Sequence, residues 1–382
     1  MGKKLSEGMM NTNVLIFLFW RPFVIRQSPG NWQKSPKFKS LIGKPFMRIH
    51  YTKQNLNRCS FNTRTWITLC LCISSFIFSG CSDKNIEESL TIESETILDS
   101  IPSGSGLAIH NDIVYIIGDD ATGVYTLNPE NLSQSKTAIP GFVYSEYRQP
   151  KETKHDFESA TLISWQNKQF LLAFGSGSKK NFRDSLLVFN INNHNDQRIF
   201  SLTQFYGELQ RQTVTDPSQW NVEGSTVTSQ DLLLCNRGNN LIIKLPLKEF
   251  LEYVLDDHPT LPNASYHQVK LPMIDDKEAR FSGMCTFNDS IILFCASVED
   301  TPDWIQDGPV MGSYIGIYSI SENKLVASFL LKDKQGKVLK EKIESIDILN
   351  RDSESISLLA IADNDNGSSK LFRLRLRLDS FK

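Results

Sequence analysis

The chain is poor in features that would name a reaction. Among its 382 residues are six histidines and seven cysteines. The spacings Gly-x-Ser-x-Gly, His-Glu-x-x-His and Cys-x-x-Cys do not occur in it. These absences exclude a serine-hydrolase elbow, a zincin metal site and a dithiol redox motif.

Acidic residues are almost missing from the start of the chain. Residues 1–80 hold 12 Lys and Arg but a single acid, Glu7, which leaves 29 basic and 42 acidic residues in the remainder. The remainder therefore carries a net charge of -13. Such a body repels phosphate groups, so we expect no nucleic-acid partner.

The apolar run Trp66–Phe78 is too short to span a membrane. Its 13 residues would rise about 20 Å as a helix, against a hydrocarbon core of roughly 30 Å. Arg58 and Arg64 precede it, and Ser79-Gly80-Cys81 follow it. This order is typical of a signal sequence. The segment resembles the lipobox of bacterial lipoproteins, which implies cleavage before Cys81 and a lipid on that cysteine.

The resulting organisation has three parts. Residues 1–80 form a signal region, with the lipoprotein signal at about 58–80, residues 81–89 form a polar tether, and residues 90–382 form the folded domain. An uncleaved anchor or an ordinary signal peptide remain alternatives. Met47 is a possible start, which leaves open whether residues 1–46 are translated.

Location follows from the same resemblance. It implies a cell-envelope protein that meets the membrane through its lipid anchor. Ser82, rather than Asp, follows Cys81, and by resemblance to lipoprotein sorting this favours the outer membrane, at its periplasmic or surface face.

Cysteines are scarce after Cys81. Cys235, Cys285 and Cys295 remain, and each lies in an apolar run. An odd number gives no disulfide framework. A free cysteine in such a run behaves as a small buried hydrophobic residue.

A short phrase recurs five times after residue 100. Its copies are GSGLAI at Gly104, FESATL at Phe157, VEGSTV at Val222, FSGMCT at Phe281 and IESIDI at Ile343. Counted from Ser105, Glu158, Glu223, Ser282 and Glu344, the spacings are 53, 65, 59 and 62 residues. Periods of this size indicate a repeated supersecondary unit.

Each copy opens a series of short strands broken by Asn, Asp, Gly and Ser. Three strands are visible in every unit, and a fourth is expected in four units, at about 136–142, 198–205, 265–272 and 325–331. The last unit lacks a fourth strand, but one additional strand, Leu90–Leu98, precedes the first unit. If it completes the last blade, the ring closes and no sheet edge stays open. The sequence therefore predicts an all-β, five-bladed β-propeller, with six blades as the alternative and one helix at Leu247–Leu255.

Propeller geometry brings the polar residues together. The start of the innermost strand and the loop after the second strand lie at the same end of a blade, because each strand reverses direction. We expect one mouth of the central channel to hold the following residues: Glu158, Glu223 and Glu344 from the strand starts, Asp119, Asp120, Glu299 and Asp363 from the loops, and Arg237 among the acids. Asp300, Asp365 and Arg183 belong to the same loops.

Crowded carboxylates repel each other unless a cation lies between them. Glu158, Glu223 and Glu344 are therefore candidate ligands for a hard cation such as Ca²⁺. The alternative is that they accept hydrogen bonds from neighbouring blades and hold the ring together, since a role repeated in every blade is often architectural.

The motifs VEGSTV, FESATL and IIGDD at Ile116 resemble those of phytase-like esterase, SdiA-regulated and gluconolactonase-like propellers, over most of residues 101–376. The resemblance implies an uncharacterised propeller lipoprotein whose mouth binds a divalent cation and, in some relatives, hydrolyses phosphate or carboxylic esters. The first and fourth copies carry Ser105 and Ser282 in place of Glu.

Two function classes follow. The first is a lipid-anchored protein that binds a small molecule, a glycan or a partner protein at the mouth. The second is a metal-dependent phosphoesterase or esterase. A structural scaffold is the third reading, favoured if the glutamates are fully occupied by contacts between blades.

Overall fold

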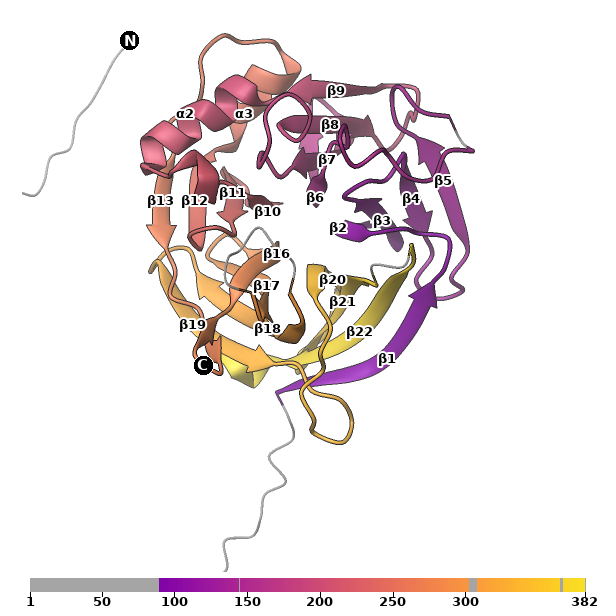
Figure 1. The fold of residues 1–382 in the computed structure, drawn as a ribbon, viewed down its shortest axis with the longest axis vertical. Coiled ribbons are helices and arrows are strands. Elements are labelled where there is room, and N and C mark those ends of the chain that lie inside the picture. The colour runs from indigo at the N-terminus through magenta and orange to yellow at the C-terminus, as the bar shows by residue number, and fades with distance from the viewer. Residues whose placement is uncertain (1–88, 144, 302–307, 365–366, 382) are drawn as a thin grey trace, which may run out of the picture. The chain divides into compact units, whose positions relative to one another are not determined.

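The computed structural model describes residues 89–381, apart from residues 144, 302–307, 365 and 366. These residues form five four-stranded antiparallel sheets arranged as blades around a central axis (Figure 1). The prediction of an all-β, five-bladed propeller is confirmed, and the six-bladed alternative is excluded. The expected signal region, Cys81 and nearly all of the tether lie outside the described residues.

Four blades follow one another along the chain, each ordered from the axis outward. Blade 1 contains β2 (Gly104–His110), β3 (Ile113–Gly118), β4 (Gly123–Leu127) and β5 (Gln134–Ala138). Blade 2 contains β6 (Phe157–Trp165), β7 (Lys168–Gly175), β8 (Ser185–Asn190) and β9 (Gln197–Ser201). Blade 3 contains β10 (Val222–Val227), β11 (Asp231–Asn236), β12 (Leu241–Pro246) and β13 (Ser265–Gln268). Blade 4 contains β16 (Arg280–Asn288), β17 (Ile291–Glu299), β18 (Val310–Ser319) and β19 (Lys324–Leu330).

Blade 5 closes the ring with strands from both ends of the domain. It contains β20 (Ile343–Arg351), β21 (Ser355–Asp363), β22 (Ser369–Arg377) and, outermost, β1 (Leu90–Leu98). β1 runs antiparallel to β22, with Leu90 opposite Leu376 and Leu98 opposite Ser369. The predicted closing strand is therefore confirmed, and this pairing covers the edge that β22 would otherwise expose.

Blade 5 is also joined to blade 1 through side chains. The hydroxyl of Ser369 accepts a hydrogen bond from the Gly104 N–H at 2.9 Å, and that of Ser345 accepts one from the Leu107 N–H at 3.1 Å. The Asp347 carboxylate accepts one from the Ile109 N–H at 2.7 Å. The inner strand of the first blade thus has its edge N–H groups paired by the last blade.

Every innermost strand carries a β-bulge at the same place. The register of β2 slips between Gly104 and Gly106, and the other four inner strands slip at the equivalent step. The residue skipped in each strand is the polar residue of the repeated phrase: Ser105, Glu158, Glu223, Ser282 and Glu344. Because a bulge redirects a side chain, the repeat encodes a ring of five redirected polar residues.

The residue after each bulge must be small. A Cβ at Gly106 would lie 2.8 Å from the Ala160 backbone nitrogen, and one at Gly283 would lie 2.6 Å from the Glu344 carbonyl oxygen. The inner strands of neighbouring blades approach closely at this point. This explains the recurring Gly or Ser in the third position of the phrase.

The core lies between blades. Four clusters of buried apolar side chains occupy the wedges where neighbouring sheets face each other. The cluster between blades 2 and 3 also receives two helices, α2 (Thr203–Thr213) and α3 (Leu247–Leu255). A two-stranded hairpin of β14 (Met273–Ile274) and β15 (Lys277–Glu278) precedes blade 4, and short 3-10 turns lie at Pro217–Gln219 and Leu378–Phe381.

The predicted helix Leu247–Leu255 is confirmed as α3, an insertion before the outer strand of blade 3. Helix α2 was not predicted. The fourth strand of blade 2 was expected to reach Phe205 but ends at Ser201, and Phe205 lies in α2. Phe205, Leu209 and Thr213 recur every four residues on the buried side of that helix, which is helical and not strand spacing.

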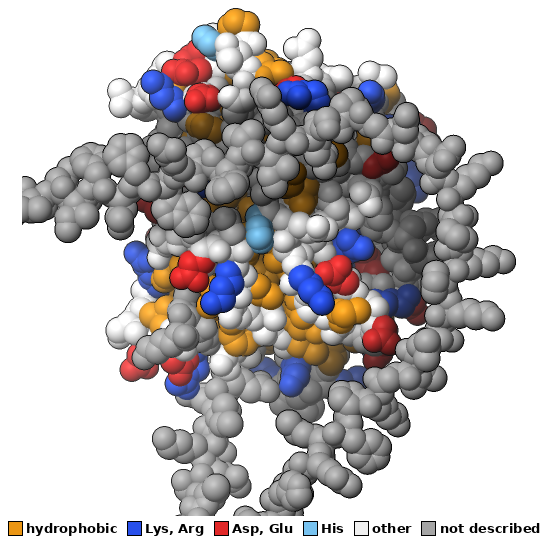
Figure 2. Space-filling model, turned by 90° about the vertical axis from the view of Figure 1, so that its left-hand side faces the viewer, with side chains coloured by type: hydrophobic (Ala, Val, Ile, Leu, Met, Phe, Trp, Pro, Cys, Tyr) orange, Lys and Arg blue, Asp and Glu red, His pale blue; other side chains and the backbone are white. Residues whose placement is uncertain are grey.

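The outer side of blades 3 and 4 has a mixed surface. Hydrophobic side chains lie there among positive and negative ones, and no single sign of charge prevails (Figure 2). Along the whole described chain, no helix has the length and apolarity needed to cross a membrane.

Candidate functional site

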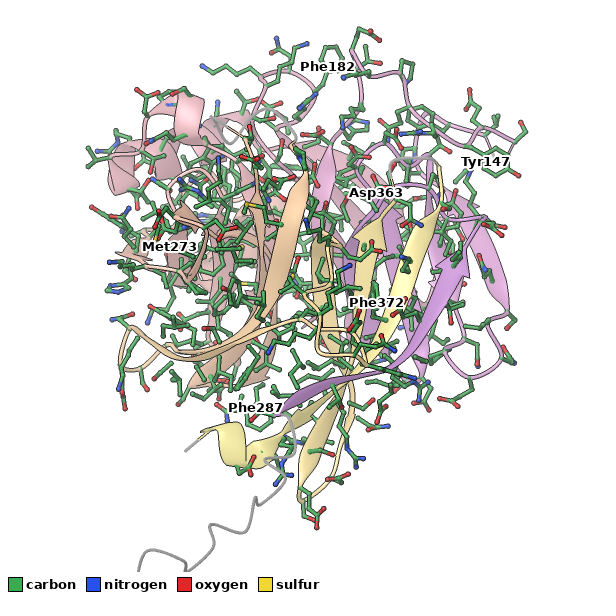
Figure 3. The ribbon with its side chains drawn as sticks, turned by 60° about the horizontal axis from the view of Figure 1, so that its bottom comes forward. Tyr147, Phe182, Met273, Phe287, Asp363 and Phe372 are labelled. Atoms are coloured by element: carbon green, nitrogen blue, oxygen red, sulfur yellow. The ribbon has the colours of Figure 1, made fainter. Side chains whose placement is uncertain are left out.

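The mouth of the channel is defined by matching hydrogen bonds in three blades. The first residue after the second strand donates its N–H to the residue two places before the bulge: Asp119 to Ser103 at 3.1 Å, Ser176 to Asp156 at 2.9 Å and Arg237 to Asn221 at 2.7 Å. Strand starts and loops therefore share one end of each of these blades, as the sequence predicts. Asp363, at the end of β21, lies at this end of blade 5, and Phe287 of β16 lies toward the opposite end (Figure 3).

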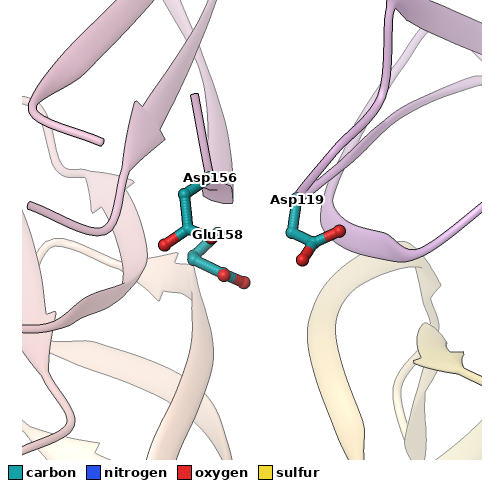
Figure 4. Close-up of side chains that lie close together, drawn as sticks. All are labelled: Asp119, Asp156 and Glu158. Carbon is teal, nitrogen blue, oxygen red and sulfur yellow. The ribbon is translucent and has the colours of Figure 1, made fainter. Parts of the chain in front are cut away.

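Three carboxylates from blades 1 and 2 converge at the mouth. Asp119 follows β3, and Asp156 and Glu158 open β6 (Figure 4). One oxygen from each lies within 4.8 Å of the others, so the group could hold a metal ion. The ammonium of Lys154 lies beside this group, 2.7 Å from Asp156 Oδ1 and in contact with Asp119. We call Asp119, Lys154, Asp156 and Glu158 the triad half of the mouth.

Glu158 is the least paired carboxylate of the triad half. Asp156 also binds Arg183 at 3.1 Å and the Ser176 hydroxyl at 2.5 Å. Glu158 forms no hydrogen bond or ion pair with any residue that the structure describes. Burial raises the pKa of Glu158 well above its ordinary value, and the charges of Glu223, Asp156 and Asp119 add to that rise while Lys154 opposes it.

Burial and the neighbouring carboxylates also act on the pKa of Lys154, in opposite directions. Burial acts to lower the pKa of its ammonium, but the charges of Asp156, Asp119 and Glu158 outweigh burial and raise it. Lys154 is therefore held as a cation by the carboxylates around it. It supplies part of the positive charge that an ion at this position would supply.

Blades 3, 4 and 5 build a different arrangement. Arg237, whose side chain is 4% exposed, pairs with Glu299 and lies 4.0 Å from Glu223. Lys342 lies 3.1 Å from Glu344 and 3.9 Å from Glu299. The Asn221 amide donates to Glu223 at 2.6 Å. We call Glu223, Arg237, Glu299, Lys342 and Glu344 the paired half, because each of its carboxylates faces a cation of the chain.

Burial still shifts the glutamates of the paired half. It raises the pKa of Glu344 to about 8, although Lys342 and Arg237 oppose the shift. It also raises the pKa of Glu223, again against Arg237 and Lys342. Both carboxyl groups therefore hold their protons more tightly in the folded chain than in water.

Two further predicted residues, Asp120 and Asp363, interact with Arg148. Arg148 donates to Asp120 at 2.6 Å. The pKa of Arg148 is raised, first by this hydrogen bond and also by the charges of Asp119 and Asp363. Asp300 instead pairs with Lys277 at 2.7 Å, and Asp365 lies outside the described residues.

The predicted calcium ligands are only partly brought together. Glu158 belongs to the triad, but its partners there are Asp119 and Asp156, not Glu223 and Glu344. Those two glutamates lie in the paired half, next to Arg237 and Lys342. The reason is that Glu223 and Glu344 already face cations of the chain, the predicted Arg237 and the unpredicted Lys342.

Most of the mouth residues that the sequence did not predict occupy the same position relative to the bulge. Two places before the five bulge residues stand Ser103, Asp156, Asn221, Arg280 and Lys342. All are polar, and four of them bind a side chain at the mouth or its loops: Ser103 to Arg148, Asp156 to Lys154, Asn221 to Glu223 and Lys342 to Glu344. This periodicity was present in the sequence. Lys154 and Arg148 lie in a long loop, outside the repeat.

A closed ring of five blades with a charged channel mouth defines the class: a β-propeller in which the bulge of each inner strand carries a polar residue. The chain belongs to a family of unknown function, DUF6929, whose model matches residues 100–376. A search among curated proteins found no match.

Several solved propellers share the general fold. Glutaminyl cyclase of Myxococcus xanthus is 10% identical, with a TM-score of 0.42 over 76% of this chain and 97% of that one. A putative exported protein of Bacteroides fragilis is 12% identical, with a TM-score of 0.37 over 77% and 97%. A luciferin-regenerating enzyme is 6% identical, with a TM-score of 0.39 over 74% and 95%. Identities this low carry no activity from one propeller to another.

Proposed function

We propose that this propeller is a binding protein of the cell envelope that captures a ligand carrying a primary amine at the channel mouth. One observation carries the proposal. Glu158 has no hydrogen bond or ion pair among the described residues, whereas Glu223 and Glu344 have partners within the chain. A carboxylate left among other carboxylates is stabilised by any cation or donor that reaches it.

An amine suits this position better than an anion or an apolar group. Asp119, Asp156 and Glu158 lie together, and Lys154 is the nearest cation among them. An ammonium donates up to three hydrogen bonds. The ammonium of a ligand could therefore bind Glu158 without displacing Lys154. An anion would meet the charges of the triad half unfavourably.

Matched pairs of probes test the amine. Putrescine, glucosamine and lysine amide would be compared with 1,4-butanediol, glucose and norleucine amide by calorimetry and thermal melting of the full-length protein. We expect at least one amine to bind and its neutral counterpart not to bind. Glu158→Gln should abolish the binding, and Glu93→Gln, at an exposed position of β1, should retain it. Equal binding by Glu158→Gln, or no amine binding at all, would contradict the proposal.

The envelope location rests on the sequence around Cys81, which resembles a lipobox. A labelled fatty acid fed to a Gram-negative host expressing the chain tests it directly. We expect the wild type and Cys70→Ser to take up label and Cys81→Ser to take up none. Label on Cys81→Ser, or none on the wild type, would refute lipid anchoring.

A metal-dependent hydrolase of phosphate or carboxylic esters is the second candidate. The spacing of Asp119, Asp156 and Glu158 favours it. Oxygen ligands of this kind suit Ca²⁺, and a calcium ion would activate water for ester hydrolysis. The position of Lys154 argues against it, because the ammonium of Lys154 already contacts two of the three carboxylates.

Calcium titration separates the two candidates. If the chain binds amines, adding calcium or a chelator should leave its melting temperature unchanged, and it should not hydrolyse p-nitrophenyl phosphate or p-nitrophenyl acetate. Calcium that co-purifies with the chain, together with calcium-dependent hydrolysis lost in Glu158→Gln, would favour the hydrolase.

A further inference from the structure

A second cavity lies away from the mouth, between the sheet of blade 2 and the end of helix α3. Its volume is about 350 Å³. Trp165 and Gln166 line it at the turn between β6 and β7, and Leu255 and Asp256 line it at the end of α3. β6 begins at the mouth with Phe157 and ends at Trp165, so this cavity opens at the opposite end of the blade.

The cavity has an apolar wall. Trp165 and Leu255 form it and are both half-buried, whereas Phe170 and Val188, which also line the cavity, are buried. An indole ring offers a flat, rigid surface whose face carries partial negative charge. Groups with slightly positive C–H bonds pack well on such a face.

Polar groups surround this wall and are already held in place. The Trp165 and Gln166 side chains donate to Asp256 at 3.5 Å and 3.3 Å. Asp196 accepts from Lys168 at 3.0 Å and from Asn190 at 2.9 Å. A carboxylate has about four acceptor sites, so Asp196 and Asp256 retain capacity for a ligand.

The lining carries no net charge. Lys168 and Arg198 balance Asp196 and Asp256. Gln166, Asn195 and Gln197 add neutral groups that both donate and accept. A charged ligand would find as much repulsion as attraction here, whereas a neutral ligand rich in hydroxyl groups would find partners of both kinds.

From these observations we propose that the cavity binds a neutral saccharide. The C–H face of a pyranose ring would pack on Trp165, and its hydroxyls would donate to Asp256 and Asp196 and accept from the amide and cationic groups. The cavity volume falls within the usual range of small-ligand sites. This site is separate from the mouth and goes beyond the function proposed for it.

The test uses neutral disaccharides with the full-length protein. Cellobiose, maltose, lactose and diacetylchitobiose would be titrated by calorimetry, with indole fluorescence as a second signal. We expect at least one to bind with a Kd at or below about 1 mM, a free energy near 4 kcal/mol. Trp165→Ala and Asp256→Asn should each weaken that binding about tenfold or more, equivalent to about 1.4 kcal/mol.

Three further variants make the result specific. Asp276→Asn changes an exposed residue in the turn between β14 and β15, which does not line the cavity, so binding should stay within twofold. Trp165→Phe keeps an aromatic face and should bind more tightly than Trp165→Ala, and it replaces that variant if alanine unfolds the chain. Glu158→Gln, at the mouth, should bind the disaccharide normally. No binding by any disaccharide, or unchanged binding in Trp165→Ala, overturns the proposal.

Discussion

The two halves of the mouth use the same backbone device with opposite charge balance. In blade 5, Glu344 stands on its bulge and Lys342, two residues earlier, lies 3.1 Å from it. In blade 2, Glu158 stands on the equivalent bulge, and the residue two places earlier is Asp156, a second acid. The residue two places before the bulge therefore decides whether a cation of the same strand neutralises the carboxylate at the bulge.

The comparison shows which mouth carboxylates have partners within the chain. In the paired half, Glu223 is met by Arg237 and Asn221 and Glu344 by Lys342, all from their own blades and not from the neighbouring blades of the architectural interpretation. The triad half leaves Glu158 without such a partner among the described residues. The proposed amine site depends on this difference between the two halves.

The largest expected effect comes from removing the central cation of the paired half. Arg237→Met would leave Glu299 and Glu223 buried without their arginine, and uncompensated buried charges cost about 3–5 kcal/mol. Chemical denaturation of wild type and variant measures the loss. The exposed pair of Arg211 with Glu208 is the control: Arg211→Met should leave the free energy of unfolding almost unchanged, because solvent screens an exposed ion pair. Equal losses would show that Arg237 is not a structural cation.

Removing the lysine of the triad half should have a smaller effect. Lys154→Met leaves Asp156 bound to Arg183 and Ser176, so we expect a loss of about 1.5–3 kcal/mol, the range for one hydrogen bond to a charged group. The variant should also gain calcium binding, because the three carboxylates then lack their ammonium. Calcium should raise the melting temperature of Lys154→Met but not that of wild type or of Lys324→Met, an exposed control. A variant that ignores calcium would show that the triad is no ion site.

The sequence predicts the blades and the repeated polar residues well but places the cations poorly. The five phrases locate the redirected residues because each copy meets the same steric demand, a bulge followed by a Gly or Ser where backbones approach. Arg237 was found because it directly follows a strand. Lys154 and Arg148 belong to the long loop between β5 and β6, whose path no repeat constrains. Lys342 and Asp156 could have been found by reading two positions upstream of each bulge.

A third prediction concerns pH and Glu158. Its pKa is raised from the ordinary 4.5, so the folded state binds the proton more tightly than the unfolded state. The resulting stability is fully present below pH 4.5 and is lost as the pH rises through the folded pKa. Glu158→Gln resembles the protonated form. It should match wild type at pH 4 and be more stable than wild type at pH 8, because glutamine does not take on the charge that burial and the nearby carboxylates oppose.

Thermal and chemical unfolding across this pH range checks that sign, with Glu93→Gln as the matched control. The exposed Glu93 should give a difference from wild type that does not change with pH. If Glu158→Gln destabilises the chain at pH 8, Glu158 has a partner in the folded protein and the proposed amine site is lost.

The smallest effect should come from Glu223→Gln in the paired half. Glutamine keeps the oxygen that accepts the Asn221 amide at 2.6 Å, and Arg237 keeps its pair with Glu299. We expect only a small change in melting temperature, the same with calcium as with a chelator. Melting curves of both proteins in both buffers measure it. Calcium could instead stabilise the wild type and have no effect on Glu223→Gln. This result would mean that one ion contacts both halves, which would then form a single metal site.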